Sequence, residues 1–448
     1  MADAESFPFL RLPLELREAI YSLYFKPSDR LDQSPSLDAQ GYFGGVYRFD
    51  LNLSRVNKQV YDEAKKVWKR ENVFIKIATP WPSAVNHISS EGLVPIVCAD
   101  RRADAFTSHH ALVQITAPFH PAAPEHTVVV LLDDLHMFTQ TWYYSALSYP
   151  MLNDRLSTTF ILRDPDHSDS DGEAQSNNNG VNIPLQKRLL FPFEQVKGLY
   201  HMEVSGFASS VRTELERRMA IPIPTLQQCC ESATELMAQG DIALAANNAH
   251  EALELYRRAF HAIHILIHGR TRRVLADVFF HEGIEHGRYA GQTGMTVRVI
   301  LRLKLVCRTI AAYLRVGQWG EAAYWGMRSI CIMREAMDTE FEDFLSEFVG
   351  GADVGLIYVR TAIAFMKMED AREQWGVELS RYNDEPVASS ENLWGLAVRY
   401  LRNQDKESVR KELRQVGAPQ ETIGLFGEVE KSVDEQSTVG HHGSEEGN

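Results

Sequence analysis

The sequence predicts an α+β N-terminal region, made of two helices and a β-sheet, followed by an all-α domain of helical-hairpin repeats. Two stretches before residue 72 repeat apolar residues at the spacing of one helix face. Short runs rich in β-branched residues follow between residues 73 and 162. After residue 225, long stretches of Ala, Leu, Glu, Arg and Gln continue without a strong strand pattern. This change of period divides the chain into two halves.

Two amphipathic helices are expected at the start of the chain. The first covers residues 12–24, where apolar residues are spaced four, four and three apart and Pro13 lies in the first turn, which tolerates proline. Residues 26–46 are rich in Ser, Pro, Asp and Gly, so we expect a loop there. The second helix covers residues 53–67 and should end near Asn72.

The middle of the N-terminal half is predicted to form one sheet. Its expected strands are Val73–Ile77, Leu93–Val97, Leu112–Ile115, Thr127–Leu132 and Thr158–Leu162. A further strand is expected around Tyr200–Val204, and Trp142–Leu147 is predicted to be a helix packed on the sheet. Residues 164–180 have almost no apolar side chain, which predicts a disordered insertion. We therefore assign residues 7–77 to a helical segment and residues 78–207 to a sheet region continuous with it.

Pro222 and Pro224 mark the boundary to the second half of the chain. Residues 225–380 are predicted to form the helical domain, because apolar and small residues recur there at helical spacing. Residues 381–431 are expected to be a helical or loop extension. Residues 432–448 are rich in Gly, Ser and Glu, which predicts a disordered tail.

Small residues and single aromatics recur within the helical half. In one copy, three small residues lie at offsets 0, 12 and 19, a second copy surrounds Trp319, and a weaker third copy ends at Ala371. The residues that carry the pattern are Gly240, Ala252, Tyr256, Ala259, Tyr313, Gly317, Trp319, Ala322 and Ala371. The spacing resembles the tetratricopeptide repeat, in which small residues let the two helices of a hairpin approach closely and the aromatic fills the gap.

Two of these alanines, Ala252 and Ala322, are 70 residues apart, close to two periods of ~34 residues. We therefore expect one degenerate repeat between them. The alternative is a plain helical bundle in which the spacing of small residues is accidental. Repeat arrays usually offer a concave face to a peptide or protein, although many only pack against their own neighbours.

The N-terminal helices carry a two-part motif. Its residues are Leu12, Pro13, Glu15, Leu16, Arg17, Ile20 and Tyr21, then Leu53, Val56, Lys58, Gln59, Val60, Glu63 and Ala64. The motif resembles the F-box-like domain that is widespread in filamentous-fungal proteins. This resemblance implies a module that binds the Skp-type linker of a cullin ubiquitin ligase, joined to a C-terminal recognition domain. It also implies a set of protein-interaction residues, namely Leu12, Pro13, Leu16, Ile20, Val56 and Val60.

A second interpretation of the same apolar side chains is open. Apolar residues at helical spacing are mostly core, so Leu12, Leu16, Ile20, Val56 and Val60 could simply pack between the two helices and the sheet. This interpretation is favoured for any one of them taken alone. Partner binding requires that some of them be exposed.

The histidines of the helical half do not form a convincing metal site. His281 and His286 flank acidic residues, but they are five residues apart, which turns one of them away by ~140° on a helix. A surface helix end is the favoured interpretation. His261, His264 and His268 share a helical face, yet no Cys or carboxylate on that face completes a coordination shell. We expect no metal and no cofactor.

No known catalytic motif occurs in the sequence. The vicinal pair Cys229 and Cys230 lies at the start of a predicted helix, where packing is favoured over a reactive thiolate because no partner His or Asp can be placed nearby. The basic run at residues 270–273 is expected to be a solvated helix start, with binding of an acidic peptide as the alternative. No nucleophile elbow, phosphate loop or dinucleotide fingerprint is present.

Composition narrows the class of protein. The chain has 448 residues, 44% of them hydrophobic, and a net charge of −14, which argues against sequence-independent binding to nucleic acid or to an anionic membrane. The five cysteines form no CxxC pair, as in a reduced intracellular protein. With no signal peptide or bilayer-spanning run, a cytoplasmic or nuclear location is expected.

These observations favour a non-catalytic protein-interaction protein that acts as the substrate-recognition adaptor of a cullin-type ubiquitin ligase. One alternative keeps the helical array as a scaffold and discards the ligase role. Another is a metal-dependent enzyme whose site is assembled from residues distant in sequence, for example the His-rich stretch at residues 109–136. The partner and the biological process do not follow from the sequence.

Overall fold

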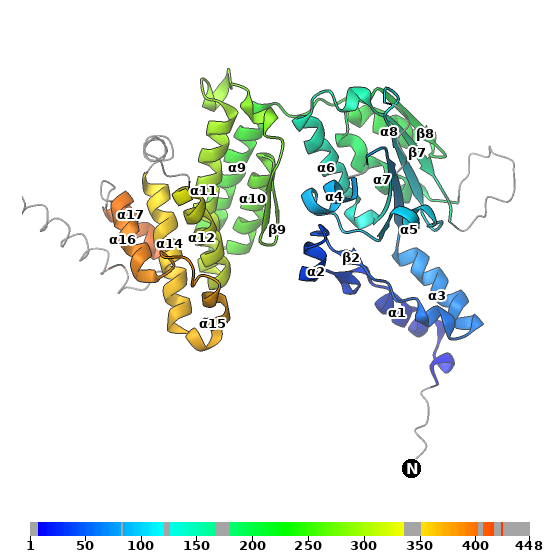
Figure 1. The fold of residues 1–448 in the computed structure, drawn as a ribbon, viewed down its shortest axis with the longest axis horizontal. Coiled ribbons are helices and arrows are strands. Elements are labelled where there is room, and N and C mark those ends of the chain that lie inside the picture. Colours follow the sequence, from blue (N-terminus) through cyan, green and yellow to red (C-terminus); the bar gives the residue numbers. More distant parts are fainter. Residues whose placement is uncertain are drawn as a thin grey trace, which may run out of the picture. The chain divides into compact units, whose positions relative to one another are not determined.

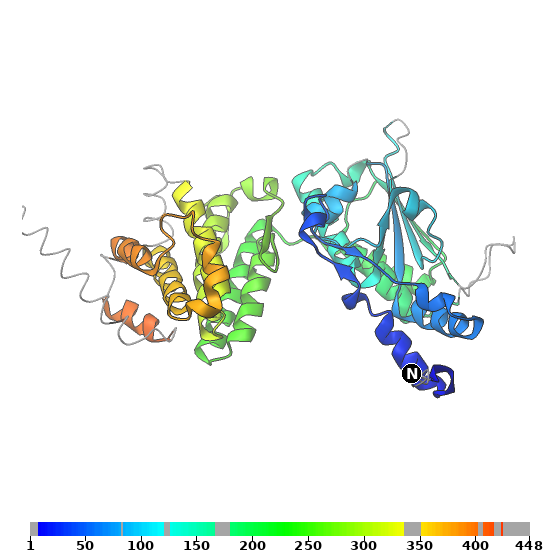
Figure 2. The ribbon, with the colours of Figure 1, turned by 60° about the horizontal axis from the view of Figure 1, so that its bottom comes forward.

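The computed structural model divides into two compact units, Met1–Ile223 and Pro224–Asn448. The residues that it describes are 8–81, 84–120, 126–165, 180–335, 351–401, 406–415 and 423. The first unit contains a sheet with helices, and the second consists mainly of helices (Figures 1 and 2). The division lies beside Pro222 and Pro224, where the period of the sequence changes.

The first unit begins with a helix pair, α1 (Leu14–Tyr24) and α3 (Lys58–Glu71). Asn57 caps α3, because its side chain accepts a hydrogen bond from the N–H of Val60 at 2.9 Å. The segment between the helices carries three short elements, β1 (Leu31–Asp32), α2 (Pro35–Asp38) and β2 (Val46–Tyr47). The two helices enclose a small core of Tyr21, Phe25, Val60, Ala64 and Val67.

Six strands form one mixed sheet in the order β4-β6-β3-β5-β7-β8. Their bounds are β3 (Phe74–Thr79), β4 (Cys98–Ala99), β5 (Ala111–Thr116), β6 (His126–Leu131), β7 (Ser157–Leu162) and β8 (His201–Ser205). Strand β3 runs parallel to β5 and antiparallel to β6, while β7 is antiparallel to β5 and parallel to β8. The strands predicted near residues 73, 112, 127, 158 and 200 are therefore present.

The sheet is packed on both faces. Three helices cover one face, α6 (Leu135–Ser148), α7 (Ile183–Leu190) and α8 (Ser209–Met219) (Figure 1). Successive side chains of a strand point to opposite faces, so Ile75 and Ile77 of β3 pack in the core with Phe138 of α6. Phe74 packs on the other face against Trp68 of α3, with 5.4 Å between the ring centroids. The helix pair is thereby joined to the sheet.

The strand predicted over Leu93–Val97 is wrong. The chain there follows α4 (Ala84–Asn86) and a π-helix over His87–Glu91, and Leu93 has a φ of +56°, which interrupts any extended run. The strand that does form here, β4, is limited to Cys98–Ala99 and pairs with β6. The helix predicted over residues 142–147 is confirmed as part of α6.

The second unit is built from packed helices. Their bounds are α9 (Leu226–Ala245), α10 (Ala249–Ala262), α11 (Gly294–Arg315), α12 (Trp319–Glu335), α14 (Gly351–Asp370), α15 (Arg372–Ser380), α16 (Ser390–Leu401) and α17 (Lys406–Gln415). Helix α9 begins with a capping box in which Thr225 and Gln228 each accept from the other's backbone N–H. Helix α9 packs on α10, α11 on α12 and α14 on α16 (Figure 2).

The sequence predicts an all-α second half, and this prediction is wrong. Strands β9 (Ile265–His268) and β10 (Thr271–Val274) form an antiparallel hairpin, with Gly269 at a φ of +54° in its two-residue turn. The degenerate repeat expected between Ala252 and Ala322 is also wrong, because the hairpin and two 3-10 helices take its place. The apolar run before Gly269 is typical of a strand, but it is short, and the helical pattern on both sides of it hides this signal.

Several predicted segments reach beyond the residues that the structure describes. Residues 166–179 of the predicted insertion and the whole predicted tail, 432–448, lie outside them. Within the predicted extension at residues 381–431, α16 and α17 are helical. In the described part of the chain, no helix has the length and apolar character needed to cross a bilayer.

Candidate functional site

Helix α1 exposes an apolar face. Leu16, Ile20 and Leu23 follow one another at spacings of four and three, so they lie on one side of the helix, and 53%, 41% and 68% of their surfaces are exposed. The side that faces α3 buries Arg17 and Tyr21. The helix is thus reversed relative to an ordinary amphipathic helix, with its aliphatic face directed to solvent.

A buried polar cluster holds α1 in this orientation. Arg17 donates from Nε and Nη2 to the two carboxylate oxygens of Glu63 on α3, at 2.8 and 2.7 Å. The Tyr21 hydroxyl donates to the same carboxylate at 3.0 Å, and Gln59 donates to it at 2.9 Å. The hydrogen bonds from Arg17 are the main cause that lowers the pKa of Glu63 to about 2, against the opposing effect of burial. Glu63 is therefore ionised at neutral pH.

The predicted interaction residues divide into two groups. Pro13, Leu16, Ile20 and Val56 are exposed and Leu12 is half-buried, so the interpretation of Leu16, Ile20 and Val56 as core is wrong. Val60 is 1% exposed and packs between α1 and α3, so it cannot contact a partner. Among the described residues, eight exposed large apolar side chains precede α3, namely Leu10, Leu14, Leu16, Ile20, Leu23, Phe43, Leu51 and Val56. Three of them, Leu16, Ile20 and Leu23, share one face of α1, and exposed apolar patches are typical of interaction surfaces.

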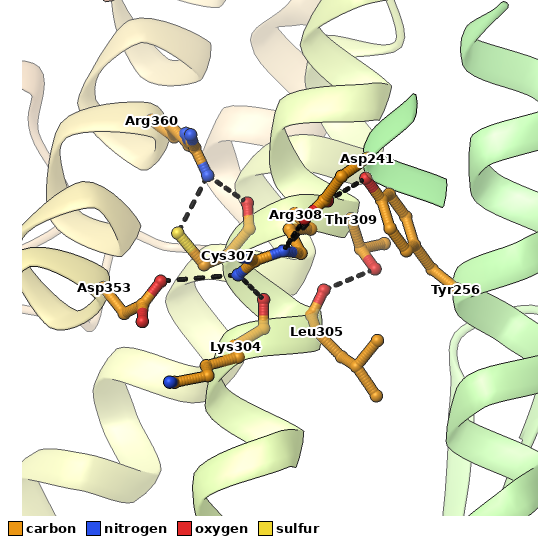
Figure 3. A network of polar contacts seen from close by, with 9 residues as sticks. All are labelled: Asp241, Tyr256, Lys304, Leu305, Cys307, Arg308, Thr309, Asp353 and Arg360. Carbon is orange, nitrogen blue, oxygen red and sulfur yellow. Dashed lines mark hydrogen bonds and ion pairs between the residues drawn. The ribbon is translucent and has the colours of Figure 1, made fainter. Parts of the chain in front are cut away.

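The second unit contains a polar pocket of about 300 Å³ lined by α9, α11 and α14. In its lining, Arg308 of α11 donates from Nε to both carboxylate oxygens of Asp241 on α9, each at 2.9 Å (Figure 3). Its Nη1 lies 3.5 Å from an oxygen of Asp353 on α14. The Tyr256 hydroxyl of α10 donates to Asp241 at 2.8 Å. One guanidinium in the pocket lining therefore links three helices.

The neighbouring carboxylate keeps the Arg308 guanidinium charged in this pocket. Burial opposes the charge of Arg308, but the Asp241 carboxylate outweighs it and raises the pKa of the guanidinium. Arg360 of α14 donates to the carbonyl oxygen of Cys307 at 2.7 Å, and Arg315 also lines the pocket (Figure 3). The lining therefore presents cationic and anionic groups beside the apolar Leu244 and Leu356.

The residues of the first copy of the repeat pattern lie together where α9 packs on α10. A Cβ at Gly240 would lie 2.4 Å from Cε1 of Tyr256, so only glycine lets the aromatic ring sit against α9. Tyr256, Ala252 and Ala259 are completely buried. At this hairpin, the small residue Gly240 lets the two helices approach closely with the Tyr256 ring between them, as the sequence predicts.

The pattern residues of the second and third copies differ in their burial and in their position within the helices. Gly317 has a φ of +72° in the turn between α11 and α12, and Ala322 is completely buried, while Tyr313 and Trp319 are half-buried. Ala371 lies in the break between α14 and α15, not within a second helix of a hairpin. The third copy therefore does not match the other two.

Of the predicted chemical candidates, the structure brings Cys229 beside His264. Cys229 Sγ lies 3.9 Å from His264 Nε2, with both side chains buried; burial raises the pKa of Cys229 to about 11 and lowers that of His264 to about 3. This thiol and imidazole are both neutral at pH 7, so they form no nucleophile pair. His281 ends a 3-10 helix that does not reach His286. Among the described residues, no group of three or more potential ligands could hold a metal ion.

The sequence predicts that the basic run at residues 270–273 is a helix start. This prediction is wrong, because the run is part of the β9–β10 hairpin. Arg270 forms ion pairs with Glu321 at 2.9 Å and Glu378 at 2.8 Å. Arg272 is 7% exposed and lies over the ring of Trp325, 3.5 Å from its centroid. These arginines join the hairpin to the helices.

Neither the protein-family models, nor the curated proteins, nor the solved structures gave a match to this chain. The F-box-like and tetratricopeptide-like assignments therefore stay predictions from the residues. Sequence reasoning missed the roles of Arg17 and Glu63, although both belong to the quoted motif. It also missed Asp241, Arg308 and Asp353, which carry no local signal because they come from three separate helices.

Proposed function

We propose that this chain is a non-catalytic protein-interaction protein that serves as the substrate-recognition adaptor of a cullin-type ubiquitin ligase. The observation that carries the proposal is the exposed face of Leu16, Ile20 and Leu23 on α1. Leaving three aliphatic side chains in water forfeits the free energy that their burial would provide. A partner helix or groove that covers this face would recover it.

The position of α1 supports a docking role. The Arg17–Glu63 pair fixes the helix on α3 before any partner arrives, so little conformational entropy would be lost on docking. The exposed Val56 precedes α3 and adds a second element of the same motif. The partner that the motif implies is the Skp-type linker of the ligase.

The second unit would then bind the substrate protein. We assign it as a tetratricopeptide-like array, supported by the close packing of Gly240 on Tyr256 and by the turn at Gly317. Its pocket between α9, α11 and α14 offers both signs of charge, around Arg308 and Asp353, to an extended segment of a substrate.

An affinity pull-down from the native cytosol tests the adaptor role. The wild-type chain should recover a cullin together with its linker, and the double variant Leu16→Asp plus Ile20→Asp should lose both, because two charges would be desolvated in the interface. A matched control places aspartate at two other exposed apolar positions, Ile221→Asp plus Val377→Asp, which are 55% and 80% exposed. The control variant should recover the ligase as the wild type does.

The same experiment separates the adaptor from a scaffold. A wild-type pull-down that recovers stable partners but neither a cullin nor a linker contradicts the adaptor role and favours a scaffold. Partners of an adaptor should also accumulate when the proteasome is inhibited, whereas partners of a scaffold should not. Circular dichroism of both double variants checks that their helices are retained.

A further inference from the structure

Three arginines of the second unit gather beside the β9–β10 hairpin. Arg272 lies on β10, and its guanidinium covers the ring of Trp325 on α12, 3.5 Å from the ring centroid. Arg328 follows Trp325 by three residues on α12, which places it one turn away on the same face. Arg302 lies on α11, one turn after Arg298, which donates to the backbone carbonyls just before β9 and just after β10. Three elements therefore each contribute one cation.

The three guanidinium groups repel one another. Burial is the main cause that lowers the pKa of Arg272, and repulsion from Arg328 and Arg302 follows it. Burial and then repulsion from Arg328 lower the pKa of Arg302 in the same way. Each pair within the cluster therefore interacts unfavourably while no anion lies between its members.

No carboxylate offsets this repulsion in the part of the chain that the structure describes. There, Arg272, Arg302 and Arg328 make neither a hydrogen bond nor an ion pair. The arginines next to them differ in this respect, since Arg270 pairs with two glutamates and Arg298 with an aspartate. The cluster therefore has a positive charge for which the described residues supply no counterion.

A ligand can reach the cluster from solvent. Arg328 is exposed and Arg302 is half-buried. Arg272 is 7% exposed; its Nε and Nη2 are enclosed, but its Nη1 is not enclosed in that way. Arg302 and Arg328 therefore offer direct contact to an anion, and Arg272 adds its positive charge beside them.

We propose that Arg272, Arg302 and Arg328 together bind a phosphate dianion, either as the free ion or as the phosphate group of a monoester. A guanidinium presents its N–H donors in a fork that matches the oxygens of phosphate, and it stays charged when it is partly buried. A dianion among the three cations would replace their mutual repulsion with attraction. This binding is independent of the proposed adaptor role, because it requires neither a ligase nor a substrate protein.

Isothermal titration calorimetry of the full-length chain tests the proposal. The probes are inorganic phosphate and methyl phosphate at about pH 8, where both are mainly dianions, with the ionic strength held constant by sodium chloride. We expect saturable binding of inorganic phosphate, and binding of methyl phosphate as well if the site accepts a monoester. Arg302→Gln and Arg328→Gln should each weaken binding by about tenfold, as expected for one lost charge-assisted contact. The absence of saturable binding of both probes to the wild type would overturn the proposal.

Arg334→Gln is the matched control. Arg334 is another exposed arginine of α12, but it follows Arg328 by six residues, which turns it by ~120° around the helix. This variant loses the same charge and should bind phosphate as the wild type does. If Arg334→Gln and Arg328→Gln weaken binding equally, the general charge of the helix attracts the anion, and the assignment to the cluster is wrong.

Thermal unfolding gives a second measurement that depends on Arg272. A ligand that binds only the folded chain raises its melting temperature, so phosphate should raise that of the wild type. The shift should be much smaller in Arg272→Met, and equal shifts in the two chains would overturn the role of Arg272. If this variant does not fold, Arg302→Gln and Arg328→Gln keep the test decisive, because neither of these side chains is fully buried.

Discussion

Arg17 and Glu63, 46 residues apart in the chain, form a two-point ion pair between α1 and α3 with N–O distances of 2.7 and 2.8 Å. Their side chains are 9% and 15% exposed. Fork-to-fork pairing of a guanidinium with a carboxylate fixes orientation as well as distance. The pair therefore determines which face of α1 is buried, and with it which residues can meet a partner.

Removing one member of this pair should be worse than removing both. Arg17→Met leaves the largely buried Glu63 carboxylate without its cation, so we expect a melting temperature lower by several degrees. The double variant Arg17→Met plus Glu63→Met should recover part of that loss, because no unpaired charge remains. A double-mutant cycle by thermal denaturation measures the coupling. Simple additivity of the two single substitutions would contradict the pairing.

The pH dependence of stability should report on Glu63. Its pKa is lowered from 4.5 to about 2 in the folded protein, so its stabilising effect is complete above about 4.5 and is lost as the pH falls toward 2. Glu63→Gln should be less stable than the wild type at pH 7. The difference in free energy of unfolding between the two should shrink as the pH falls from 4.5 to 2, as urea denaturation at each pH would show. A difference that stays constant would contradict this pKa.

Gly240→Ala should destabilise the second unit. The added Cβ would come 2.4 Å from the Tyr256 ring, and relief of that overlap should cost about 1–3 kcal/mol. Gly376 lies inside α15 with no atom within 4 Å of an added Cβ. Gly376→Ala should therefore stabilise the chain by about 0.5–1 kcal/mol through the higher helix propensity of alanine. Urea denaturation of both variants checks the opposite signs, and equal effects would show that α9 does not pack on Tyr256.

Arg272→Met should raise the free energy of unfolding. Arg272 is buried, its Nε and Nη2 have no hydrogen-bond partner among the described residues, and burial followed by repulsion from Arg328 and Arg302 lowers its pKa to about 9. Methionine keeps the contact with Trp325 and removes the charge, for a gain of about 1 kcal/mol.

The control for this substitution is Arg257→Met, which removes an arginine paired with Glu254 on the surface of α10. Its effect should stay within about 0.5 kcal/mol. Chemical denaturation compares the two variants. A loss of stability in Arg272→Met larger than that in Arg257→Met would mean that the buried guanidinium is stabilising, contrary to the expectation.

Local pattern predicted most of the elements of this chain. Apolar spacing located α1 and α3, β-branched runs located five strands of the sheet, and small residues located the contact of Gly240 with Tyr256. Each of these depends on neighbours within about twenty residues, which is why the sequence reveals them. The hairpin β9–β10 escaped because a four-residue strand is too short to interrupt a helical pattern on both sides.

The sequence by itself determined where most of the helices and five strands of the large sheet form and where the chain divides into two halves. Only the tertiary structure decided which face of α1 is buried: spacing alone favours Leu16 and Ile20, but the structure buries Arg17 and Tyr21 instead. The reason is that a buried guanidinium is tolerated only beside a carboxylate, and Glu63 reaches it from another helix. The pocket around Arg308 has the same origin, since Asp241 and its partners meet only when three helices pack together.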